Sequence, residues 1–139
     1  MCKAGTTLLE LLVALGLGAV LIAGGALGLT ALMVHVRLAG AADALATALR
    51  AARVEALARH EELVVRFDRR AAGWTVVSPN GTALATALLP SGVAIADVPP
   101  RGRVRFGPLG TADNASIRLE AGDGERVVVV NQRGRVRSR

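Results

Sequence analysis

The feature that most constrains this chain is an uninterrupted apolar run near its amino terminus. No charged residue occurs from Leu11 to Val34, and Leu8 and Leu9 extend the run beyond a single carboxylate, Glu10. As a helix, residues 8–34 would be roughly 40 Å long, whereas the hydrocarbon core of a bilayer is about 30 Å thick. The apolar core of a secretory signal peptide is only about 7–15 residues long. The sequence therefore predicts a transmembrane helix over residues 6–34.

The helical pattern continues beyond the apolar run and gives way to strands near residue 62. Leucines and alanines recur at spacings of three and four, which forms one apolar stripe: Leu38, Ala42, Leu45, Leu49, Ala52 and Ala56. Strand-like segments then follow, separated by turn signals. They are expected at 63–68, 74–77, within 88–98, and at 103–106, 117–120 and 127–130. We predict an α+β fold in which the amphipathic half of the helix, 35–61, packs on an antiparallel sheet built from 62–139.

Residues that could carry catalysis are poorly represented. His35 and His60 are isolated, and the only cysteine, Cys2, precedes the apolar run. We find no phosphate-binding glycine loop, no metal-ligand cluster and no nucleophile beside a base. We therefore expect no enzyme activity, metal ion, cofactor or small-molecule substrate.

Arginine dominates the charge of the chain. The formal net charge is +6, and the pentapeptide Arg-Gly-Arg-Val-Arg occurs at 101–105 and again at 133–137. In a strand, alternate side chains share a face, so Arg103 would project with Arg105, and Arg135 with Arg137. Two interpretations stay open: a solvated edge that discourages aggregation, or a surface that binds DNA or another anion. The candidate residues are Arg103, Arg105, Arg133, Arg135, Arg137 and Arg139.

The amino-terminal segment resembles a type III prepilin signal. Its matching features are a short basic leader ending in Gly5, then Thr6, and Glu10 inside the apolar run. The resemblance implies cleavage after Gly5, so that residues 1–5 are a leader and Thr6 carries the new amino terminus, which pilins methylate. In pilins the glutamate that Glu10 matches is thought to meet the free amine of a neighbouring subunit. Glu10 is therefore the expected assembly residue.

The rest of the chain resembles the GspH/FimT family of minor pseudopilins and minor pilins. The resemblance rests on Gly73-Trp74, on Phe106-Gly107-Pro108-Leu109-Gly110-Thr111, and on Val127–Val130 running into Asn131–Arg137. It implies a non-enzymatic subunit of a type II secretion pseudopilus or a type IV pilus. Such a subunit is anchored in the bacterial inner membrane with a periplasmic carboxyl-terminal domain, and its partners are other pilins and the prepilin peptidase.

Two alternatives to this function remain. In some type IV members a carboxyl-terminal Gly-Arg-x-Arg motif is associated with DNA binding during uptake. Gly134, Arg135 and Arg137 fit that motif. The second alternative is an uncleaved single-pass anchor that carries a binding domain.

Overall fold

The computed structural model describes residues 7–139, apart from the side chains of residue 22 and residues 24–28. The first element is a single helix, α1 (Leu8–Arg59), of 52 residues. Its carboxyl end is closed by a left-handed residue, His60, with φ 54°. The amide of His60 donates to the carbonyl of Leu57, and the amide of Glu61 to that of Ala56. This is a Schellman motif, which satisfies carbonyls that the end of the helix would leave without partners.

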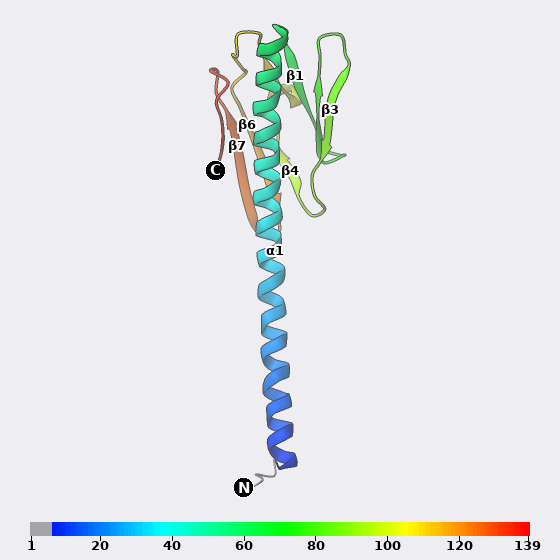
Figure 1. The fold of residues 1–139 in the computed structure, drawn as a ribbon, viewed down its shortest axis with the longest axis vertical. Coiled ribbons are helices and arrows are strands. Elements are labelled where there is room, and N and C mark those ends of the chain that lie inside the picture. Colours follow the sequence, from blue (N-terminus) through cyan, green and yellow to red (C-terminus); the bar gives the residue numbers. More distant parts are fainter. Residues whose placement is uncertain (1–6) are drawn as a thin grey trace. The chain divides into compact units, whose positions relative to one another are not determined.

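The chain divides between Met33 and Val34 into two compact units. The second unit holds the carboxyl-terminal half of α1 and every described strand (Figure 1). The strands are β1 (Leu63–Asp68), β2 (Gly73–Val77), β3 (Ala83–Leu88), β4 (Ala94–Asp97), β5 (Arg103–Phe106), β6 (Ala115–Ala121), β7 (Gly124–Val130) and β8 (Val136–Ser138). A short 3-10 turn, η1 (Pro100–Gly102), precedes β5. The predicted class, a long amino-terminal helix packed on antiparallel strands, is confirmed.

The strands form two four-stranded antiparallel sheets rather than one. The order is β3-β2-β1-β5 in the first sheet and β4-β6-β7-β8 in the second. The chain changes sheets three times, between β3 and β4, between β4 and β5 and between β5 and β6. At the second change, Pro99 and Pro100 cannot donate to a ladder. β3 and β8 were not predicted from the sequence. β3 is rich in alanine, which has little strand propensity, and β8 is only three residues long.

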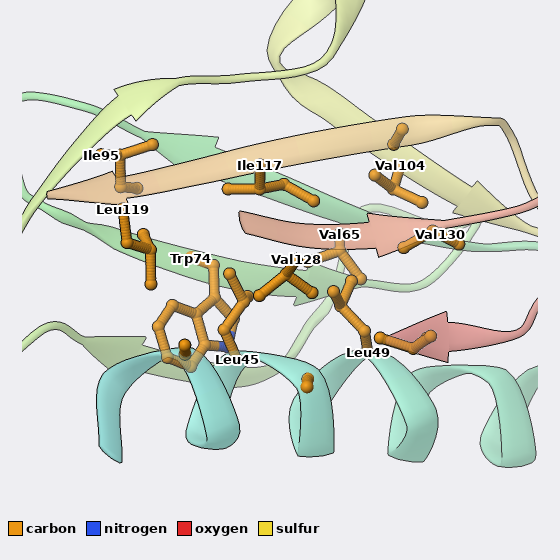
Figure 2. Close-up of a cluster of buried hydrophobic side chains, with 14 of the residues drawn as sticks. Leu45, Leu49, Val65, Trp74, Ile95, Val104, Ile117, Leu119, Val128 and Val130 are labelled. Atoms are coloured by element: carbon orange, nitrogen blue, oxygen red, sulfur yellow. The ribbon is translucent and has the colours of Figure 1, made fainter. Parts of the chain in front are cut away.

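The core of the second unit lies between α1 and the inner faces of both sheets. Figure 2 shows Leu45 and Leu49 of α1 pointing into a cluster that includes Val65 and Val128. All six residues of the predicted stripe are at most 2% exposed, which confirms that face of the helix. Buried and exposed side chains alternate along the whole of β6, from the buried Ala115 to the buried Ala121. The other faces of the two sheets therefore remain available for polar side chains.

Candidate functional site

The start of α1 is built as a helix cap around Thr7 and Glu10. The amide of Glu10 donates to the hydroxyl Oγ1 of Thr7 at 3.3 Å. Thr7 thus occupies the N-cap position and Glu10 the third helical position, the spacing of a capping box. A carboxylate in the first turn is also favoured by the helix dipole. Glu10 therefore has a local role in addition to the assembly role expected from the sequence.

Apolar side chains on the first part of α1 are exposed in the isolated chain. Leu8 is 81% exposed and Leu21 76%, with Leu15 and Leu17 above 60%. Such a surface is costly in water and calls for lipid or neighbouring helices. Gly5 and Thr6, the predicted cleavage site, lie outside the described residues.

The carboxyl-terminal arginines line one open cleft. Arg137 is the cross-strand partner of Val129, on the outer face of the second sheet, and all three arginines at 135, 137 and 139 are exposed. They line a cleft of about 310 Å³ together with Val129 and Asn131. No Asp or Glu side chain lines this cleft, so the three guanidinium groups give it a potential that favours an anion. Arg133 is exposed in the turn before β8.

Polar side chains of α1 hold the carboxyl-terminal segment and the loop after β5 in place. Arg50 donates to the carbonyl of Val136 at 3.4 Å, and the hydroxyl of Ser138 donates to the carboxylate of Asp43 at 3.3 Å. One turn further along, Arg53 Nε donates to the carbonyl of Gly110 at 3.1 Å. The cleft is therefore positioned by the helix as well as by β7.

Gly134 allows the turn before β8 to pack closely. Its φ is +69°, and a Cβ at this position would overlap the carbonyl oxygen of Gly110 and lie 2.5 Å from Arg53 Nε. Asn131 closes the same turn, because its side-chain oxygen accepts from the amide of Arg135 at 2.8 Å. The glycine of the Gly-Arg-x-Arg pattern therefore has a structural reason that is independent of any ligand.

The first arginine repeat lies in the other sheet. Arg103 and Arg105 are on β5, whereas Arg135 and Arg137 are at β8. Arg105 is engaged by Asp113 through two hydrogen bonds, at 2.9 and 3.3 Å. The hydrogen bond from Arg105 lowers the pKa of Asp113, and the same contact raises the pKa of Arg105. Of these two arginines, only Arg103 has no carboxylate partner within residues 7–139.

Sequence reasoning missed the residues that anchor the carboxyl-terminal cleft. No role for Asp43, Arg50 and Arg53 was predicted from the sequence. Their spacing places them beside the buried face of the helix, which was the available signal. Their partners lie in β8 and in the loop after β5, and local sequence does not predict these contacts. Across the part of the chain that the structure describes, no cluster of three or more potential metal ligands occurs.

Together, the long apolar helix and the antiparallel strands packed on its carboxyl-terminal half define a pilin-like protein. Solved structures of two other proteins are examples of this fold. The type IV minor pilin FimU of Pseudomonas aeruginosa has a TM-score of 0.61 at 20% identity, over 76% of this chain and 90% of that chain. The minor pseudopilin EpsH from the type 2 secretion system of Vibrio cholerae has a TM-score of 0.63 at 14% identity, over 74% and 96%. At these identities the likeness establishes the fold alone.

The family is established by sequence. Residues 41–134 match the family model of the type II transport protein GspH, and the chain belongs to this family. This confirms the predicted membership among the minor pseudopilins and minor pilins. No curated protein matches the sequence.

Proposed function

We propose that this chain is a minor pilin or pseudopilin subunit that joins a filament through its amino-terminal helix. The observation that carries the proposal is the exposed apolar surface at the start of α1 with one carboxylate, Glu10, in its first turn. Leucines of this kind suit a helix that leaves the bilayer only to pack on other helices. Membership of the GspH family supports the same role.

We assign the membrane segment to residues 6–34, the bounds expected from the sequence. By length and composition alone, Leu29–Arg59 is apolar enough to cross a membrane, and Leu8–Leu21 is a shorter apolar stretch. However, Leu29–Arg59 contains six charged residues and carries the stripe that is buried against the sheets. Residues 11–34 contain no charge at all. We therefore keep the transmembrane helix at the amino-terminal end, with the second unit in the periplasm.

In this proposal Glu10 pairs with the free amine of Thr6 on a neighbouring subunit, after cleavage behind Gly5. An unpaired carboxylate costs about 2.5–3.5 kcal/mol at the centre of a bilayer and less near its surface. An ammonium partner in the same apolar environment removes that cost and attracts strongly. Because only one axial offset brings the two groups together, the pair would fix the register of the subunit in the filament.

The test is in vivo crosslinking of the full chain to neighbouring pilins, with Glu10→Ala and Glu10→Gln compared. Both variants should insert in the membrane, since each removes a desolvation cost, and both should lose crosslinks because neither carries a negative charge. Glu62→Gln, an exposed carboxylate after α1, is the matched control and should crosslink normally. Undiminished crosslinking of both Glu10 variants would refute the pairing.

A second candidate function is capture of DNA at the carboxyl-terminal cleft. It is favoured by one observation, the cleft of three exposed arginines that no Asp or Glu side chain lines. Phosphate contacts would dominate the binding, because no aromatic side chain lines this cleft and bases would have nothing to stack on. The proposal predicts affinity that falls steeply with salt, by about 0.9 logarithmic units per decade of salt for each phosphate contact.

The DNA test uses the full chain in neutral detergent. Changing Arg135 and Arg137 together to Gln should reduce the salt slope by about two contacts, regardless of DNA sequence. Arg118→Gln, which removes an exposed arginine paired with Glu125, is the control. If the unchanged protein binds no DNA at low ionic strength, this second function is rejected and the filament role is unaffected.

A further inference from the structure

A second arginine-rich surface lies on the outer face of the first sheet, away from the carboxyl-terminal cleft. Arg66 of β1 and Arg103 of β5 are direct cross-strand partners. Directly opposed side chains in an antiparallel ladder come close enough to interact, and two like charges there are destabilising. Neither guanidinium has an ion-pair partner among residues 7–139. The fold thus retains a repulsive pair that Gln or Thr at either position would relieve.

Beside this pair the surface is hollowed into an open groove of about 650 Å³. Three arginines, one carboxylate and one hydroxyl contribute its polar lining, and Val77 and Val98 contribute apolar surface. The polar residues are Arg66, Asp68, Arg69, Arg70 and Thr75. Thr75 is the partner of Arg66 on β2, so it shares the outer face with the arginine pair. The groove therefore combines cationic groups, a hydroxyl and an apolar floor.

Neighbouring contacts fix the end of this groove. Arg69 donates to the carbonyl of Ala96, which ties the β1–β2 turn to β4 of the other sheet. Asp68 accepts from the amides of Arg70 and Ala71 at 2.8 and 3.0 Å, and these hydrogen bonds lower its pKa. Its carboxylate is consequently ionised and committed to the turn. Arg66, Arg70 and Arg103 remain as cations without a carboxylate hydrogen bond in the described structure.

We propose that this groove is a docking surface for an acidic segment of a neighbouring protein subunit. Charge complementarity selects the occupant, since a carboxylate seated between Arg66 and Arg103 would convert their repulsion into two attractive contacts. The apolar floor and the ionised Asp68 at the rim favour a protein segment over a continuous polyphosphate backbone. Such a segment would place an apolar side chain on the floor beside its carboxylate. The inference rests on the proposed function in that it requires a neighbouring subunit.

The test places a photo-crosslinking amino acid at Thr86 in the full chain, expressed in its own cells. Thr86 is exposed on β3, and its hydroxyl donates to that of Thr75 at 3.3 Å, so it reports on the groove without lining it. We expect an adduct whose mapped partner peptide contains Asp or Glu. Arg66→Gln combined with Arg103→Gln should reduce its yield by about fivefold, as expected for two exposed ion pairs.

Arg118→Gln combined with Arg126→Gln is the matched control, because it removes the same charge from the second sheet and should leave the yield unchanged. Reversing the charge of both Arg66 and Arg103 to Glu should abolish the adduct, and reversing the mapped carboxylate to Arg should restore it. An adduct that nuclease removes, a partner peptide without an acidic residue, or equal yields in the Gln variants and their control would overturn the proposal.

Stability provides an independent readout. If Arg66 and Arg103 repel each other, the double Gln variant should unfold at or above the midpoint temperature of the unchanged chain. A lower midpoint would contradict the repulsive pair and overturn the proposal. The Glu10 variants distinguish this docking surface from the filament role. Loss of helix crosslinks in these variants refutes neither of the two proposals. A Thr86 adduct from a chain that shows no Glu10-dependent crosslink would refute only the pairing of Glu10 in the filament.

Discussion

Gly134→Ala should destabilise the second unit far more than a usual glycine substitution. The backbone is left-handed at this position, with φ +69°, which costs Ala about 1 kcal/mol. In addition, the new Cβ would overlap the carbonyl of Gly110 and the guanidinium of Arg53. Relieving the overlap separates the hydrogen-bonded pair formed by these two groups, at 3.1 Å, which costs about 1.5–3 kcal/mol for a charged donor. We expect a total of about 3 kcal/mol.

The loss can be measured by thermal unfolding of the full chain in neutral detergent. Trp74 is the only tryptophan and is 6% exposed, so its fluorescence reports on the core of the second unit. For a unit of this size, each 1 kcal/mol lowers the midpoint by about 4–8 °C. Gly134→Ala should therefore lower it by roughly 12–24 °C.

Gly92→Ala distinguishes the cost of steric overlap at Gly134 from the cost of placing alanine in a left-handed backbone. Gly92 also has a positive φ, +84°, but a Cβ there would meet nothing within 4 Å. This control should lose only about 1 kcal/mol. Equal losses in the two variants would refute the claim that Gly134 is required for close packing of the turn against Arg53 and Gly110.

Two further predictions concern the helix start and the response to pH. Thr7→Ala should remove the cap of α1 at a cost of about 1 kcal/mol, so hydrogen exchange of the Glu10 amide should become about fivefold faster while amides of the second unit are unaffected. Because Arg105 lowers the pKa of Asp113 below its ordinary value of 3.8, the ion pair contributes fully above that value and is lost as the pH falls through the lower folded value. Acid unfolding of Asp113→Asn should accordingly show a weaker dependence on pH below about 4, and an unchanged dependence would contradict this role.

The helix and its core face could be predicted because their signals are local. The stripe from Leu38 to Ala56 follows the period of the helix, and all of its members are buried. β1, with its bounds at Leu63 and Asp68, was likewise predicted from its own residues. The separation into two sheets could not be predicted in this way, because it depends on which strands pair across the Pro99–Pro100 break.

The candidate site residues could likewise be predicted where their signal is local, but their partners could not. Glu10 stands out as the one charge in an apolar run, so sequence alone identifies it. The arginine repeats are also visible, but their local pattern does not reveal that Asp113 engages Arg105 while Arg103 faces Arg66. The pairing of Arg66 with Arg103 depends on strand register, which links residues far apart in the chain. The contact of Asp113 with Arg105 depends on the path of the loop after β5.

The central claim, assembly through a processed amino-terminal helix, is tested most directly by determining the amino terminus of the protein extracted from membranes. Cleavage after Gly5 would leave Thr6 as the first residue, with the Thr7–Glu10 cap just inside the new terminus. Replacing Gly5 with Leu should leave residues 1–5 attached, which provides the control. The account predicts a mature chain that begins at Thr6; a mature chain that begins at Met1 in unmodified cells would contradict it.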